Sequence, residues 1–271
     1  MLLKESVFIC PVCKNKMFIF PSQVKCLKGH SFDISKQGYI NLLLDNSHNK
    51  RHGDDKLMVK ARTEFLNKEY YKPLKDNLCE IIGSGHKILD SGCGEGYYTE
   101  AISKNNEVCG FDISKDALKV AARRCKDVSF AVASIGDIPL EKASRGVILN
   151  VFAPDNPDEF YRVLCDNGRL ITVVPMERHL YGLKSAIYDE PYLNPVVEYN
   201  REGYKLLSKH ELKYSITLQC NDDIISLFKM TPYYYKTGKK DQEKINKLEC
   251  LTTEVEFCIL EYKKNLIKEL H

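Results

Sequence analysis

The chain has 271 residues, of which 44% are hydrophobic and 28% charged, and its formal net charge is +3. This composition is ordinary for a soluble globular protein, and no uncharged apolar run is long enough to cross a membrane. The length fits one α/β domain with a small appendage. Because the N-terminus lacks the apolar core and cleavage site of a signal peptide, we expect a cytoplasmic protein whose scattered cysteines are reduced thiols.

The first module carries a metal-ligand pattern. Cys10, Cys13, Cys26 and His30 follow a C-x2-C-x12-C-x3-H spacing, which can place three thiolates and one imidazole around Zn²⁺. About forty residues bury too little apolar surface to fold alone, whereas a structural zinc site supplies roughly 10–16 kcal/mol of coupled binding free energy. Four protein ligands leave no open position for water, so we predict one structural zinc ion.

The same module is basic. Residues 1–52 carry eight Lys or Arg against three Asp or Glu, and the rest of the chain carries 32 against 34. This surplus suits a polyanionic partner such as RNA, although a solvated lysine-rich surface explains it equally well. Aromatic side chains could stack on bases or form the module's own core. The lysines between or beside the metal ligands are Lys14, Lys16, Lys25 and Lys28, and the aromatic residues among them are Phe18 and Phe20.

A polar stretch, residues 31–55, indicates a linker or mobile loop. We place a domain boundary near Asp54, which gives a zinc-binding module over residues 1–53 and a second domain over residues 54–271. Apolar residues recur at intervals of three and four from residue 56 to residue 82. That period predicts one or two amphipathic helices, interrupted near Pro73.

A glycine loop follows a short strand over residues 87–90. Its glycines are spaced G-x-G-x-G, whereas the usual dinucleotide fingerprint is G-x-G-x-x-G with the last glycine inside the helix. They are Gly92, Gly94 and Gly96, and a helical pattern resumes at Tyr97. Such a loop lets a ligand approach the backbone closely.

Two acids flank this loop. Asp90 ends the strand before it, and Asp112 ends the next strand twenty-two residues later, where a carboxylate can accept both hydroxyls of a ribose. Because a carboxylate beside the loop would repel a pyrophosphate, a cationic nucleoside fits better. S-adenosylmethionine (SAM) combines an ammonium, a sulfonium and a ribose. The alternative is a generic Rossmann turn with a capping aspartate.

The rest of the chain alternates strands with helices of about ten residues, which predicts a doubly wound parallel sheet. Strands are expected at 128–133 and 168–175, and residues 146–154 are expected to form another strand and its turn. The alternating segment 254–262 is expected as an antiparallel edge strand. Helices are expected at 114–125, capped by Ser114, and at 158–164. Two more are expected at 178–190 and at 221–230, the latter capped by Asn221.

The order of motifs resembles the large-subunit (23S) ribosomal RNA (guanine-N1-)methyltransferase family over essentially the whole chain. The matching motifs are CPVC and CLKGH, GYINLL (38–43), LDSGCGEGYYT, VFAP, RHL (178–180) and MTPYYY. The resemblance implies a class I, Rossmann-like fold, with a small zinc-binding domain preceding a doubly wound, mostly parallel, seven-stranded α/β sheet. It also implies SAM as methyl donor, Zn²⁺ as structural metal and a 23S rRNA hairpin as substrate. It allows a homodimer, which no sequence feature tests.

The resemblance assigns roles to individual residues. It implies zinc ligands at the four residues given above and donor contacts at Tyr71, Asp90, Gly92, Gly94, Gly96, Tyr98, Thr99, Asp112 and His179. From composition alone, Tyr71 could instead be a core residue, and His179 could cap a helix. Ser134 stands where many relatives carry an adenine-contacting acid, which puts that contact in doubt.

Guanine N1 carries a proton that must leave as the nitrogen attacks, so a base or a hydrogen bond to the enolate-like O6 is required. Asn150, at a strand end facing the donor, is our candidate for a contact to the base edge. A NAD(P)-dependent dehydrogenase is disfavoured by the missing fingerprint glycine. A SAM-dependent methyltransferase for another RNA or a small molecule stays open, as does a non-catalytic zinc RNA-binding protein with a vestigial fold.

Overall fold

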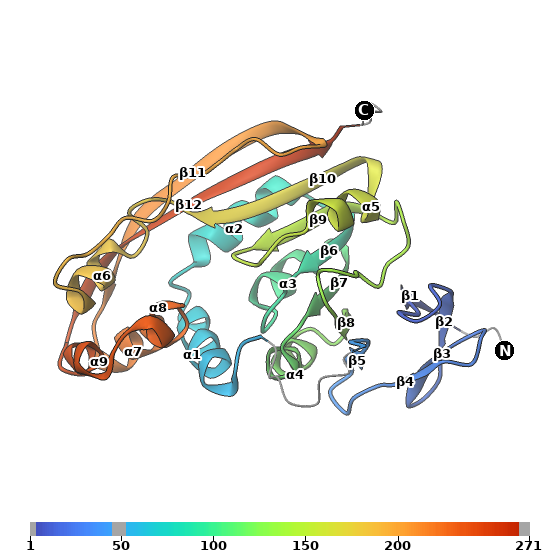
Figure 1. Ribbon diagram of the computed structural model, residues 1–271, viewed down its shortest axis with the longest axis horizontal. Helices are drawn as coiled ribbons and strands as arrows, with labels where there is room; N and C mark the ends of the chain where they lie inside the picture. Colours follow the sequence, from blue (N-terminus) through green and yellow to red (C-terminus); the bar gives the residue numbers. More distant parts are fainter. Residues whose placement is uncertain (1–3, 45–52, 266–271) are drawn as a thin grey trace.

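The computed structural model describes residues 4–44 and 53–265. A small antiparallel sheet lies at one end of the molecule, beside a larger mixed sheet covered by helices (Figure 1). Among the described residues, no helix is both long and apolar enough to span a membrane.

The small sheet is the N-terminal module, with its strands in the order β1-β2-β3-β4. Its core is small, and Phe8, Met17 and Val24 are fully buried. The module contacts the larger domain where the Ile9 backbone N–H donates to the Pro139 carbonyl at 2.9 Å. The strands are β1 (Glu5–Ile9), β2 (Lys16–Ile19), β3 (Gln23–Cys26) and β4 (Ser31–Asp33).

The larger sheet has the order β11-β12-β10-β9-β6-β7-β8-β5. Its strands from β5 to β10 pair in parallel, and β12 pairs antiparallel with both β10 and β11. All the parallel strands therefore end at one edge, where ligands of open α/β sheets bind. The bounds are β5 (Ile40–Asn41), β6 (Lys87–Ser91), β7 (Glu107–Asp112), β8 (Ser129–Val132), β9 (Arg145–Val151), β10 (Leu164–Pro175), β11 (Tyr204–Leu218) and β12 (Leu251–Lys264).

The doubly wound, mostly parallel sheet is confirmed, but it has eight strands rather than seven. The additional strand is β5, which pairs with β8 and comes from the segment predicted as a linker or mobile loop. Tyr39, Ile40 and Leu42 are buried there, so the described part of this segment is folded. The remaining part, residues 45–52, lies outside the described residues, and the domain boundary at residue 53 stays a prediction.

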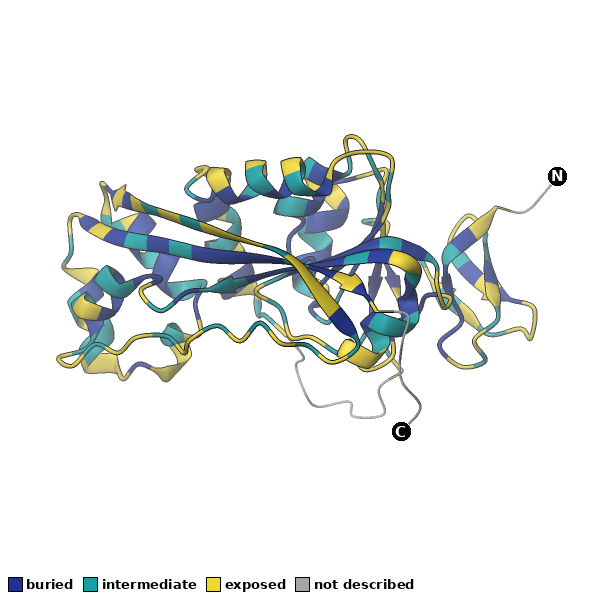
Figure 2. Ribbon diagram, turned by 90° about the horizontal axis from the view of Figure 1, so that it is seen from above, coloured by how far each residue is buried: buried dark blue, intermediate teal, exposed yellow. Residues whose placement is uncertain are grey.

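The last strand, β12, is antiparallel as expected, but its predicted place at the sheet edge is wrong. It lies between β10 and β11, and β11 forms the edge. Few side chains of β11 are buried, whereas β12 is largely buried (Figure 2). The polar edge strand lacks the apolar alternation that makes a strand recognisable in a sequence.

Helices cover both faces of the sheet. On β9, Val147 and Leu149 pack into the cluster that includes α1, α2 and α7, while Ile148 packs into the opposite cluster with α5. The helices are α1 (Lys56–Asn67), α2 (Lys72–Ile82), α3 (Tyr97–Ile102), α4 (Lys115–Arg124), α5 (Pro157–Val163), α6 (Tyr181–Ile187), α7 (Asn221–Lys229), α8 (Tyr233–Lys236) and α9 (Lys239–Asn246).

Local helix signals were mostly reliable. The Ser114 hydroxyl accepts from the Ala117 N–H and caps α4 as predicted. The expected interruption between α1 and α2 is present, and Pro73 lies in the first turn of α2. The predicted capping by Asn221 is wrong, because Cys220 occupies the N-cap position. The Asn221 amide instead donates to the carbonyls of Ile245 and Leu248, which joins α7 to the end of α9.

Candidate functional site

The glycine loop joins β6 to α3 at the carboxyl edge of the parallel strands. Gly92, Gly94 and Gly96 all have positive φ angles, of 71°, 55° and 82°. A Cβ on Gly92 would lie 2.5 Å from the Cβ of Ala153, and one on Gly96 would lie 3.1 Å from the Cα of Ala121. Glycine is therefore required at both positions by conformation and by space.

The two predicted acids lie on either side of this loop. Asp112 accepts from the backbone N–H of Gly94 at 2.9 Å and from that of Ser114 at 2.7 Å. Its carboxylate thus holds the loop against β7 while lone pairs remain for a ligand. Burial raises the pKa of Asp112, and the two backbone hydrogen bonds oppose that shift.

Asp90 is more deeply placed, with 3% of its surface exposed. It accepts from the Thr99 hydroxyl at 2.5 Å. Burial raises the pKa of Asp90 to about 7; the Thr99 hydrogen bond opposes the shift, and the charges of Asp112 and Glu95 add to it. A cation bound beside Asp90 would favour its ionised form, because it would replace some of the lost solvation.

Arg62, on α1, also belongs to this site, and sequence reasoning missed it. Its guanidinium forms an ion pair with Asp54. A Cβ on Gly94 would lie 3.7 Å from Arg62 Nη1, so this side chain lies against the loop. Burial raises the pKa of Glu95 in the loop, and the Arg62 charge opposes that shift. An arginine on an amphipathic helix carries no sequence signal of such a role.

An aromatic cluster adjoins the loop. The buried Tyr71 ring meets Phe257 edge-on at a centroid distance of 5.0 Å, and His179 lies 4.7 Å from Phe257. Tyr71 and His179 are 6.3 Å apart, so the structure brings these two predicted donor contacts together. The burial of Tyr71 also satisfies the alternative that it is a core residue.

His179 does not cap a helix, because Leu180 occupies the N-cap position of α6. Its Nδ1 accepts from the backbone N–H of Glu256 at 3.3 Å, which leaves the ring proton on Nε2. Burial, and secondarily the charge of Lys184, lowers the pKa of His179 to about 3. The imidazole is therefore neutral at physiological pH and can donate through Nε2.

Two buried hydroxyls at the loop have no hydrogen-bond partner within the described residues. They are Ser91 Oγ, at the end of β6, and Tyr98 Oη, in the first turn of α3. Buried polar groups are normally hydrogen-bonded, so a polar ligand in this site would supply the partners that these two hydroxyls lack. Together with the acids and the glycine backbone, these groups fit an ammonium- and ribose-bearing donor. Tyr98 was predicted as a contact, whereas Ser91 was not.

Asn150 lies beside Ser91 in the paired strands β9 and β6. It is buried, and its Nδ2 donates to the Pro154 carbonyl at 2.9 Å. This bond fixes the turn after β9 and leaves Oδ1 as the acceptor of the side chain. Asn150 is thus at the predicted strand end, with part of its hydrogen-bonding capacity used by the protein itself.

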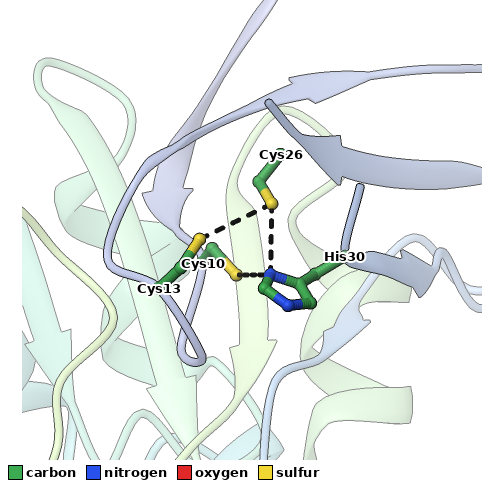
Figure 3. A group of neighbouring side chains, drawn as sticks. All are labelled: Cys10, Cys13, Cys26 and His30. Atoms are coloured by element: carbon green, nitrogen blue, oxygen red, sulfur yellow. Dashed lines mark hydrogen bonds between the residues drawn. The ribbon is translucent and has the colours of Figure 1, made fainter. Parts of the chain in front are cut away.

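The predicted zinc ligands converge from the Cys10–Cys13 turn and the β3–β4 connection (Figure 3). Cys13 Sγ lies 3.6 Å from Cys26 Sγ, and His30 Nδ1 lies 3.5 Å from Cys10 Sγ and 3.4 Å from Cys26 Sγ. All four ligand atoms are within 4.8 Å of one another. Zn–S bonds of about 2.3 Å in a tetrahedron place sulfurs about 3.8 Å apart, so the cluster fits Zn²⁺.

Known proteins match both modules. The family described as RlmA, N-terminal, matches residues 8–50, and a methyltransferase domain family matches residues 88–168. A Bacillus subtilis (strain 168) protein, provisionally named 23S rRNA (guanine-N(1)-)-methyltransferase YxjB, is 33% identical over 86% of this chain and 89% of its own length. The 23S rRNA (guanine(748)-N(1))-methyltransferase of Streptomyces fradiae is 35% identical over 66% of each chain. With its zinc ribbon and methyltransferase domain, the chain belongs to the 23S rRNA (guanine-N1)-methyltransferase family.

Proposed function

We propose that this chain transfers a methyl group from SAM to N1 of a specific unpaired guanine in a 23S rRNA hairpin. The observation that carries this proposal is the relationship to YxjB, which extends over most of both chains. A small-molecule methyltransferase would need the donor site but not a basic zinc ribbon. The homodimer allowed by the family resemblance stays a prediction, which sedimentation of the full chain tests.

The geometry of the site supports the donor roles that we propose. When bound, SAM supplies a methyl group that its sulfonium already activates. In our proposal Asp112 accepts from the ribose hydroxyls, and Asp90 lies near the ammonium. The glycine backbone admits the donor closely. The contacts are completed by Tyr71, Tyr98, Thr99 and His179.

The acceptor must be presented as an isolated base. Guanine N1 lies in the middle of the Watson–Crick edge, so the guanine must be unpaired or flipped out to react. Asn150 Oδ1 can accept a hydrogen bond from that edge. A carboxamide is not a base near neutral pH, so Asn150 would orient the guanine while another group or water takes the N1 proton.

The zinc ribbon is proposed to bind the RNA backbone next to the target. Of the four lysines beside the metal ligands, two are already paired, Lys14 with Asp137 and Lys16 with Glu5. Lys25 and Lys28 are exposed, and neither forms an ion pair within the described residues. Phe18 lies opposite Lys25 in the paired strands, so a base could stack beside a phosphate contact. Metal analysis of the full chain tests the proposed single structural zinc ion.

The decisive experiment is transfer of label from SAM to an isolated large-subunit rRNA hairpin. We expect one labelled guanine and a primer-extension stop at that position, because a methyl on N1 blocks pairing. A hairpin with adenine in place of that guanine should accept no label. Label on a pyrimidine or a ribose, or methylation that leaves reverse transcription unimpeded, would contradict the proposed acceptor atom.

A further inference from the structure

Phe152 has an unusual backbone and an unusual exposure. It follows β9 directly, and its φ angle of 54° lies in the left-handed region, which a bulky side chain rarely adopts. Its backbone N–H donates to the Val173 carbonyl at 3.1 Å, which holds the conformation. The side chain nevertheless stays 44% exposed. A strained backbone that presents an aromatic ring to solvent is typical of a functional position rather than of core packing.

The position of the ring indicates what it would contact. Phe152 lies 5.0 Å from the buried Phe257 ring and 6.5 Å from His179, nearly parallel to it at 15°. It is therefore the exposed member of the aromatic cluster that contains Tyr71 and His179. The next residue, Ala153, meets Gly92 of the glycine loop. The Phe152 ring thus lies beside the donor site, at the carboxyl edge of the sheet.

The base that accepts the methyl group needs a stacking partner beside the donor site. It must lie beside the donor methyl with its Watson–Crick edge turned inward, after losing its stacking neighbours in the RNA. An aromatic ring restores one such neighbour and fixes the plane of the base. Asn150, two residues earlier, lies close enough in the chain to contact the base edge while the ring contacts the base face.

We infer that Phe152 is the stacking platform for the target guanine, a substrate-contacting residue that sets the plane of the base against the donor. This inference rests on the proposed function and adds the residue that holds the base. If this position served only to hold its backbone conformation, asparagine would suit it better than phenylalanine, because asparagine adopts the left-handed conformation more readily.

The test compares Phe152→Asn with Phe152→Tyr in the full chain, using a 23S rRNA transcript and labelled SAM. Stacking predicts that Phe152→Asn lowers kcat/KM for RNA by roughly 10-fold or more, whereas Phe152→Tyr stays near wild type. The thermal unfolding midpoint of Phe152→Asn should be unchanged or higher, and the Kd for SAM should be unchanged. Leu207→Asn, which removes a similarly exposed apolar side chain from β11, serves as the matched control.

Wild-type rates for Phe152→Asn would overturn the inference, as would a parallel loss of SAM affinity or of thermal stability. Failure of the proposed function gives a different result. If the wild-type enzyme methylates another base, the ratio of kcat/KM for Phe152→Asn to kcat/KM for Phe152→Tyr on that base still measures the contribution of stacking. If the wild-type enzyme methylates guanine N1 and both variants match it, only the role of Phe152 is wrong.

Discussion

At the scale of single residues, the Asp112 carboxylate has two tasks, and Asp112→Ala removes both. Its carboxylate holds the loop through Gly94 and Ser114, and we propose that it also accepts from the donor ribose. Asp112→Ala should weaken SAM binding by about 2–3 kcal/mol, the range for a pair of hydrogen bonds to a charged group. Calorimetry with SAM measures this loss. Asp127→Ala, at an exposed acid, should leave the affinity unchanged, and an unchanged affinity for Asp112→Ala would rule out the ribose contact.

Asp90 makes the free protein sensitive to pH. Burial raises its pKa from an ordinary value near 3.8 to about 7, so the folded state holds this proton more tightly than the unfolded state does. The stability that comes from this proton is complete below about pH 4 and is lost as pH rises toward 7, by at most about 1.4 kcal/mol per pH unit.

The Asp90→Asn variant tests this dependence. Its thermal unfolding midpoint relative to wild type should rise between pH 4 and pH 7. Over that range the unfolded wild-type chain ionises Asp90 while the folded state keeps the carboxyl protonated, and the variant has no such group. Asp127→Asn is the control and should follow wild type at every pH. A difference between Asp90→Asn and wild type that does not vary with pH would show that Asp90 titrates normally.

The residues that the sequence made predictable are those with a local signal. The glycines, Asp90 and Asp112 belong to one strand-loop-helix motif and its neighbouring strand, so their proximity follows from parallel pairing. Ser91 and Phe152 lie within the motifs LDSGCGEGYYT and VFAP, but the sequence indicates no role for either, because one is a hydroxyl at a strand end and the other an aromatic in a turn. Their proposed roles rest on a missing hydrogen-bond partner and a positive φ angle, which only a structure reveals.

At the scale of elements, most helices were predictable, whereas two strands of the larger sheet were not. Ser114 and Pro73 act within one helix turn, so short-range chemistry decides their effect. By contrast, β5 has two residues and exists because β8 offers a free edge, and β11 is a polar edge strand. Both depend on a partner strand that is distant in the sequence, which no local pattern encodes.

The contribution of β5 can be measured by truncation. A chain that starts at residue 37 keeps Tyr39, Ile40 and Leu42 against β8, whereas one that starts at residue 54 loses them. Since each large apolar side chain contributes roughly 1.5–3 kcal/mol when fully buried, the shorter chain should be less stable by a few kcal/mol. Thermal unfolding of the two truncated chains measures the difference. Equal midpoints would show that the core folds independently of β5, as the boundary at residue 53 assumes.

At the scale of the whole molecule, the basic surplus lies in the ribbon and the chemistry lies in the larger domain. The two are joined by Ile9 and Lys14, which contact the segment after β8. RNA bound to the ribbon through its phosphates would be held at a fixed place relative to the donor site. Affinity and methylation chemistry should therefore respond to different substitutions.

The ribbon lysines allow this separation to be tested. Removing one lysine that meets a phosphate should weaken RNA binding and reduce the slope of log K against log salt by about one unit. We expect this for Lys25→Ala and Lys28→Ala, whose ammonium groups are free to meet phosphates, with SAM affinity unchanged. Lys16→Ala is the matched control, because its charge already pairs with Glu5 at 2.9 Å.

Binding curves at several salt concentrations, with the modified position mapped by primer extension, distinguish two outcomes. If the ribbon binds the RNA backbone, the Lys25 and Lys28 variants bind RNA more weakly and methylate it more slowly at low RNA concentration. The same guanine is still modified, because phosphate contacts carry no information about the base sequence. Equal salt slopes for all three variants would mean that the ribbon is not the electrostatic anchor. A changed methylation site would mean that these lysines read the RNA rather than hold it.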